Sequence, residues 1–252
     1  MLFAYLRADF KKIKGLRIFL LHLLIPICTA IAFLMYYSYA PWSVYSKLEA
    51  YFQILAIALP FLSGLFCAVL SEQELMACSF QNMLAVPCRI KAFYSKLLVL
   101  IILGAAAVLL ASVLFGAGFY FIAENVDFSL YFIMAAVITG SSIFLYIMHL
   151  FLAMRFNKGV AAGTGIVESM VSALFLTKLG DNIWIYVPAA WASRLVTMLL
   201  PEPGVIWYNN IITINYNKSC NMAVAICIIT TIAGLAAFGI WALKWDGIKG
   251  SE

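Results

Sequence analysis

Two glutamates, Glu72 and Glu74, open a short polar stretch between two long apolar stretches of the chain. The sequence from Glu72 onward predicts a helix over 72–86, with both acids at its N-terminal end, where the helix dipole favours negative charge. Pro87 ends this predicted helix, and Arg89 begins the return to the next apolar stretch. These residue types at this spacing indicate a docking segment rather than a catalytic site.

The predicted helix carries apolar side chains at i, i+4, i+7 and i+8, which form one stripe on its surface. A short amphipathic helix with such a stripe fits a groove on a partner protein. Lipid at the membrane surface is the alternative neighbour for the same stripe. Its members are Met76, Phe80, Met83 and Leu84.

A third glutamate, Glu168, lies well inside an apolar stretch, where a charged side chain costs about 2.5 kcal/mol or more. It should therefore face protein or water. It either lines a pathway for a cationic peptide or a subunit interface, or is a structural residue bonded to Ser169 or Thr164. Gly159 and Gly163 begin the same stretch, and small residues at this spacing let two helices approach closely.

No motif for enzyme chemistry accompanies these residues. A phosphate-binding loop, a zinc-binding HExxH helix and a nucleophile elbow are all absent from the sequence. The two histidines, His22 and His149, are isolated in the sequence. We therefore expect no catalytic residue, no metal site and no cofactor bound by this chain.

The composition predicts an all-α integral membrane protein. Hydrophobic residues make up 65% of the chain and charged residues 11%, far from the balance of a soluble domain. We expect one transmembrane domain over 1–252, with an amphipathic interfacial helix over 1–17. Six apolar stretches are long enough to span a bilayer: 18–37, 50–70, 97–122, 130–151, 160–177 and 222–243.

The positive charges orient these spans. If both termini are cytoplasmic, twelve of the 16 lysines and arginines lie inside, as the positive-inside rule requires, and the net charge of +5 needs no nucleic-acid partner. A seventh span over 183–200 would weaken this asymmetry, so we interpret that stretch as a re-entrant or interfacial segment on the outer face. Its tryptophans, Trp184 and Trp191, are expected at the outer membrane boundary.

The sequence over 71–98 resembles the permeases of ABC-2 type transporters. The resemblance is carried by Glu-x-Glu, then Ser-Phe-Gln-Asn-Met-Leu, then Pro-x-Arg and a lysine before the next span. The Phe-Gln-Asn form and the Pro-x-Arg turn are most similar to the lantibiotic-immunity permeases of Gram-positive bacteria. Trp191 in PAAWASR and the sequence WALKWD at 241–246 also look like that group, whereas Ala77 or Cys78 stands where many relatives have glycine.

The resemblance implies a permease of the cytoplasmic membrane that pairs with a second permease, identical or homologous. A dimer of ABC ATPase subunits, which binds ATP and Mg²⁺, would dock on residues 72–86, and the complex would expel a lantibiotic-like peptide. Export of another hydrophobic drug or lipid is an alternative with the same fold. A membrane scaffold or sensor that transports nothing is an alternative of a different class.

Overall fold

In the computed structural model of this chain, all regular secondary structure of the described residues is helical. The described residues are 2–14, 17–77, 79–122, 126–181, 183–200 and 218–247. Two 3₁₀ turns, η1 (Lys178–Gly180) and η2 (Trp184–Tyr186), lie in the chain between residues 174 and 188. The α-helices are α1 (Leu2–Lys14), α2 (Arg17–Tyr37), α3 (Val44–Met76), α4 (Gln81–Leu84), α5 (Arg89–Phe119), α6 (Ser129–Arg155), α7 (Lys158–Leu174), α8 (Pro188–Leu199) and α9 (Lys218–Lys244).

Five helices of the described residues are long and apolar enough to cross a membrane: α2, α3, α5, α6 and α9. They correspond to five of the six predicted spans. The other prediction, 160–177, corresponds to α7, which has 17 residues and ends at Leu174. At 1.5 Å per residue α7 reaches about 26 Å, short of the roughly 30 Å of a hydrocarbon core. The helix lengths therefore support a multi-pass membrane protein with five candidate spans among the described residues, and the sixth predicted span stays a prediction.

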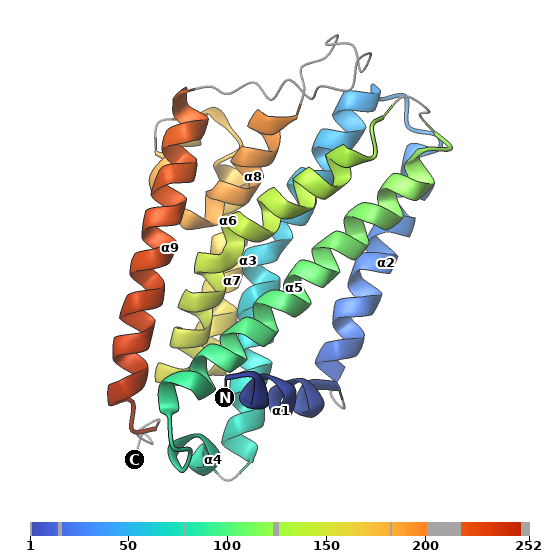
Figure 1. The fold of residues 1–252 in the computed structure, drawn as a ribbon. Coiled ribbons are helices and arrows are strands. Elements are labelled where there is room, and N and C mark those ends of the chain that lie inside the picture. Colours follow the sequence, from blue (N-terminus) through green and yellow to red (C-terminus); the bar gives the residue numbers. More distant parts are fainter. Residues whose placement is uncertain are drawn as a thin grey trace.

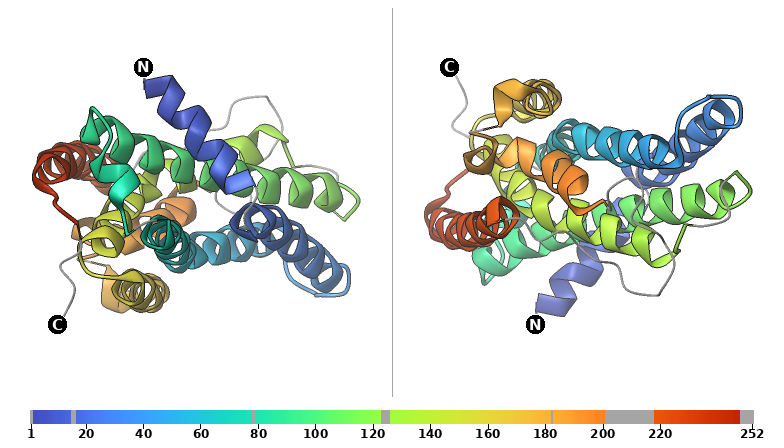
Figure 2. Two further views of the ribbon diagram at one scale, coloured as in Figure 1. Left: turned by 90° about the horizontal axis from the view of Figure 1, so that it is seen from below. Right: turned by 90° about the horizontal axis from the view of Figure 1, so that it is seen from above.

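The arrangement of the helices places the predicted docking segment beside the N-terminal helix. α3 packs against α6, α7 and α8, while α5 packs against α1, α2 and α6. α1 lies across one end of the bundle, and that end also holds α4 and the end of α9 (Figures 1 and 2). α8, which begins at the predicted re-entrant segment, lies in the opposite half (Figure 1).

The seam between α3 and α7 is the closest helix contact of the bundle core. A Cβ atom added at Gly165 would lie 2.6 Å from the carbonyl oxygen of Pro60, and one added at Gly64 would lie 3.2 Å from the Cα of Gly165. The Ser169 hydroxyl accepts a hydrogen bond from the Phe61 backbone N–H at 3.0 Å, beside the proline inside α3. Small residues and one serine therefore join these two helices.

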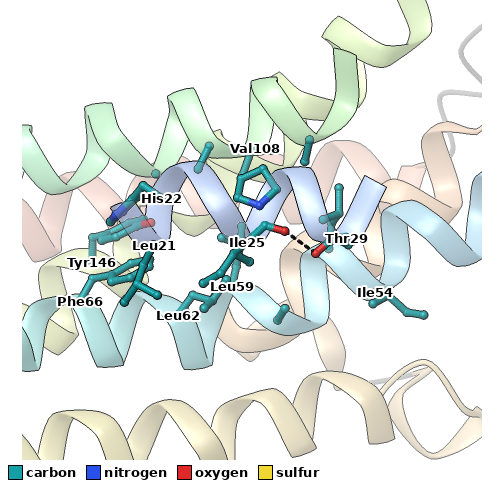
Figure 3. Close-up of a pocket in the computed structure, with 16 residues that line it drawn as sticks. Leu21, His22, Ile25, Thr29, Ile54, Leu59, Leu62, Phe66, Val108 and Tyr146 are labelled. Carbon is teal, nitrogen blue, oxygen red and sulfur yellow. Dashed lines mark hydrogen bonds between the residues drawn. The ribbon is translucent and has the colours of Figure 1, made fainter. Parts of the chain in front are cut away.

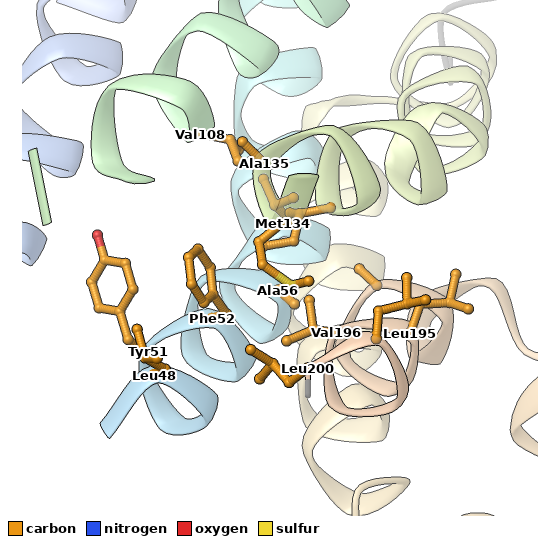
Figure 4. Packing of buried hydrophobic residues seen from close by; sticks show 14 of the residues in the cluster. Leu48, Tyr51, Phe52, Ala56, Val108, Met134, Ala135, Leu195, Val196 and Leu200 are labelled. Carbon is orange, nitrogen blue, oxygen red and sulfur yellow. The ribbon is translucent and has the colours of Figure 1, made fainter. Parts of the chain in front are cut away.

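The apolar core has two parts, one toward each end of the bundle. Figure 4 shows the part far from α1, where residues of α3, α6 and α8 interdigitate. Tyr51 stacks on Phe115 there with ring centroids 3.7 Å apart. Trp184 and Trp191 belong to this core and are buried, and the indole of Trp191 donates to the Ile185 carbonyl at 2.7 Å. Both indoles therefore pack on protein instead of facing lipid, and their place at the outer membrane boundary stays a prediction.

α8 explains why the two indoles are buried. It has 12 residues, which reach about 18 Å, too short to cross a bilayer alone. One whole face of α8 is covered by α3, α6 and α7, because its small residues allow close packing. The stretch 183–200 thus contains a short helix packed inside one half of the bundle, an arrangement that fits the predicted re-entrant segment but not an interfacial helix exposed at the outer face.

A pocket separates α2 from α3. α2 packs mainly against α5, and it leaves a space toward α3 that Figure 3 shows in close-up.

Candidate functional site

The stretch between α3 and α5 is not the single helix over 72–86 that the sequence predicts. α3 continues through both glutamates to Met76, so the acids lie at a helix C-terminal end and not at an N-terminal one. Ser79 and Phe80 then take positive φ values of 48° and 64°, which residues other than glycine rarely adopt. This turn reverses the chain before the four residues of α4. We call residues 77–88, which join α3 to α5, the docking segment.

The turn divides the predicted apolar stripe, because Phe80 and Met83 point into the bundle. Phe80 is 2% exposed and meets Trp245 edge to face, with ring centroids 5.3 Å apart. Met83 is equally buried, and Leu84 packs against the same core cluster. The indole of Trp245 donates to the Met154 carbonyl at 3.0 Å, so the ring that Phe80 contacts is itself held against α6. These apolar side chains therefore hold the docking segment and are not presented to a partner.

A different set of side chains is exposed on the docking segment and on the last two residues of α3 before it. Met76, at the end of α3, is 82% exposed, and the neighbouring exposed residues are mostly polar or small. The exposed set is Leu75, Met76, Ser79, Gln81, Asn82, Ala85 and Pro87.

A buried network of charges lies beneath this surface. Lys96 Nζ lies 2.7 Å from Glu74 Oε1 and 3.0 Å from Asp9 Oδ1. Lys12 Nζ approaches the same Glu74 oxygen at 3.1 Å, and the Ser95 hydroxyl donates to Asp9 Oδ2 at 2.5 Å. Because α1, α3 and α5 each supply members, the network joins the ends of three helices. Removal of one partner would leave an uncompensated buried charge, which is strongly destabilising.

Two ion pairs at the surface flank this network. Glu72 pairs with Lys158 at the start of α7. Arg89 donates to Asp246 Oδ1 at 3.1 Å and to the Trp245 carbonyl at 3.0 Å. Exposed pairs of this kind contribute at most about 1 kcal/mol each, so they orient the segment more than they stabilise it.

Glu168 meets a histidine rather than Ser169 or Thr164. Its Oε2 lies 2.9 Å from Nε2 of His149, and the Nδ1 of that ring lies 2.9 Å from the Ser63 hydroxyl. The Ser63 hydroxyl donates to a backbone carbonyl of α3, so it accepts from the histidine. Glu168 thus has a polar neighbour inside the bundle, as a carboxyl group at such a site requires.

The two glycines predicted to allow close helix contact lie on an open face of α7. A Cβ atom added at Gly163 would meet nothing within 4 Å, and one added at Gly159 would meet only Asn157. The close contact uses Gly165 and Gly64 instead. The open face continues with the exposed apolar residues Val160, Val167, Met170 and Leu174.

Three members of this site were missed by sequence reasoning: Asp9, His149 and Trp245. Asp9 is the only acidic residue before Glu49, which is a signal that it has a buried cationic partner. For His149 the sequence offers no comparable signal, because its partners lie on other helices.

Comparison with known proteins identifies the family of this arrangement. The family model described as ABC-2 family transporter protein matches residues 5–176, about two thirds of the chain. The match includes the helices α1 to α7 and with them the docking segment and the charge network. No curated protein and no solved structure matches the chain.

Proposed function

The chain belongs to the ABC-2 transporter family, and we propose that it is the permease of an exporter that removes a lantibiotic-like peptide from the cytoplasmic membrane. Family membership makes it a membrane subunit that works with an ABC ATPase and is not itself catalytic. The cargo and the direction of transport are our proposal.

The observation that carries the coupling role is the fixation of the docking segment at its base and at its middle. The Glu74–Lys96 pair closes its base, and Phe80 holds its middle against Trp245. A segment fixed in this way can transmit a displacement of a bound partner to the helices of the bundle without changing its own conformation. In this proposal the ATPase, which holds ATP and Mg²⁺, contacts the exposed set around Met76 and Asn82.

The network then indicates which helices move together. Lys96 joins α5 to α1 and α3, and the glycine seam joins α3 to α7. We infer that closure of the ATPase dimer displaces these helices as one body. Both termini are cytoplasmic in this proposal, and α1 and α4 lie at the same end of the bundle, as it requires (Figure 1).

The open face of α7 is our proposed contact with a second permease. Gly159 and Gly163 leave room there for the backbone of another helix, and exposed apolar residues continue the face. Glu168 lies on the same helix and is partly exposed, so its carboxylate is positioned at the edge of this proposed interface. A cationic peptide is the cargo that such a carboxylate favours.

The lantibiotic class is supported by the resemblance of residues 71–98 and 241–246 to immunity permeases. The apolar pocket between α2 and α3 favours the alternative cargo, another hydrophobic compound or lipid. The scaffold alternative is separated from both by co-purification with an ATPase.

The test is co-expression of the chain with its ATPase and partner permease in a sensitive Gram-positive host. Resistance is scored across a panel of cationic membrane-active peptides, together with a hydrophobic dye. We expect protection against lantibiotic-like peptides that is lost when the ATPase cannot hydrolyse ATP. Dye efflux without peptide resistance would favour the alternative cargo, and neither activity in an assembled complex would contradict transport.

A further inference from the structure

The pocket between α2 and α3 contains two polar atoms without a partner. It has a volume of about 110 Å³, is walled by α2, α3, α5 and α6, and is open on one side. Its walls are almost entirely apolar, with Leu21, Ile25, Leu59 and Val108 among them. Figure 3 shows His22 and Tyr146 together at one end of the pocket.

His22 offers an acceptor to this pocket. Its Nδ1 lies 2.8 Å from the Ile18 carbonyl, which can only accept, so Nδ1 carries the hydrogen. Nε2 of the neutral ring is then an acceptor, and it is buried and has no partner among the described residues. The ring is held in this orientation by stacking on Phe66, with centroids 3.8 Å apart.

Tyr146 offers a hydroxyl at the same end. The side chain is 3% exposed, and its hydroxyl likewise has no partner in the described part of the chain. A Cβ atom added at Gly104 would lie 2.1 Å from this oxygen, so the glycine provides the space that the hydroxyl occupies. The Thr29 hydroxyl, which also lines the pocket, differs because it donates to the Ile25 carbonyl at 2.7 Å.

We propose that this pocket binds a neutral membrane amphiphile whose polar group is a single hydroxyl. Its O–H donates to His22 Nε2 and its oxygen accepts from the Tyr146 hydroxyl, so both buried groups gain the partner that they lack. No lysine, arginine, aspartate or glutamate lines the pocket, which excludes a charged head group. The first carbons of the ligand fill the apolar part, and the open side lets the chain continue into lipid.

The geometry also sets the direction of the ligand. His22 lies near the end of α2 that is beside α1, whereas Thr29 and Ile54 mark the other end of the pocket. A hydroxyl at the α1 end with a tail toward the middle of the bundle matches the polarity of one leaflet of a bilayer.

The test uses the full chain in phosphatidylcholine nanodiscs with hexadecanol that carries a diazirine in its chain. We expect saturable photolabelling of peptides from α2, α3 or α5. Unlabelled hexadecanol should compete, and its methyl ether, which cannot donate to His22, should compete more weakly by a factor similar to that of the His22→Phe change. His22→Phe, which keeps the ring stacking, and Tyr146→Phe should each weaken binding roughly 5- to 30-fold, the effect of one hydrogen bond in an apolar site.

Thr29→Val is the matched control, because the Thr29 hydroxyl already has a partner, and it should bind as the unmodified chain does. The double variant at His22 and Tyr146 should lose less than the two single losses combined, because one hydroxyl serves both groups. Equal competition by alcohol and ether would overturn the proposal. Labelling that does not saturate would also overturn the proposal, because it would come from probe dissolved in the lipid and not from a binding site. Melting curves of all variants identify any that fail to fold.

Discussion

Lys96 Nζ, in the second turn of α5, lies 2.7 Å from Glu74 Oε1, near the end of α3. Both side chains are almost fully buried, and the residues between them include the whole docking segment. The pair thus joins α3 to α5 at the two points where the docking segment leaves and re-enters the bundle. Asp9 extends the contact to α1, so the N-terminal helix is part of the same rigid unit.

Lys96→Met should destabilise the protein by about 3–5 kcal/mol, because it leaves the carboxylates of Asp9 and Glu74 buried without their shared ammonium. Thermal unfolding of the purified chain in detergent measures the loss. Lys91→Met is the matched control, since the described residues show no ion pair for Lys91. Equal melting temperatures for both variants would show that the buried ion pair does not stabilise the fold.

Phe80→Ala should lower the stability of the protein, whereas Met76→Asp should lower its capture of the ATPase. Phe80→Ala leaves a cavity against Trp245 and should cost about 3–5 kcal/mol of stability. Met76→Asp changes an exposed side chain, so unfolding should shift by less than about 0.5 kcal/mol while capture of the ATPase falls. Thermal unfolding and quantitative co-purification separate the two effects. Full ATPase capture by the Met76→Asp variant would speak against the exposed set as the docking surface.

Gly165→Ala and Gly163→Ala test the two sides of α7. The added methyl at Gly165 would meet the Pro60 carbonyl, so it should cost about 1–3 kcal/mol through overpacking of the α3 seam. The same change at Gly163 meets nothing in the chain and should leave its stability unchanged. Gly163→Leu should weaken permease pairing, measured by cross-linking in membranes. Cross-linking equal to that of the unmodified chain would show that the open face of α7 does not contact a second permease.

Much of the bundle is predictable from the sequence, because long apolar stretches with few charges dictate membrane helices. All six predicted spans have helical counterparts, and five of these helices are long and apolar enough to cross a membrane, whereas α7 is shorter. A helix, α1, lies within the stretch 1–17 where an interfacial helix is expected, and its contact with a membrane stays a prediction. What the hydropathy pattern cannot give is which charged residues are buried. Asp9 and Glu74 are acidic residues of a kind usually found at the surface. They are buried because the ends of α1, α3 and α5 pack together around them.

The sequence predicts a polar connection between two membrane helices near residues 72–89, but not the local structure of that connection. Spacing arguments assume a continuous helix, and the positive φ values of Ser79 and Phe80 break that assumption. Neither residue is a glycine, so no local signal marks the turn. The turn is held by tertiary contacts, above all by Phe80 against Trp245, which is 165 residues later in the chain.

Glu168→Gln should reduce resistance to cationic peptides without unfolding the protein, if the carboxylate meets cargo. The amide can still accept near His149 and so keeps the local packing. Growth inhibition by a lantibiotic-like peptide gives the readout, with Glu72→Gln as a control on the surface of the same bundle. Resistance equal to that of the unmodified chain would leave Glu168 with a structural role only.

The proposed coupling depends most on contact between the exposed set around Met76 and Asn82 and an ATPase, and in-cell photo-cross-linking measures that contact directly. A photoreactive amino acid is placed at Met76 or Asn82, which are exposed, and at Met83, which is buried. We predict an adduct with the ATPase from the first two positions and none from the third. Labelling of positions 76 and 82 by a membrane-impermeant reagent in the outer medium, with no ATPase adduct, would contradict the account.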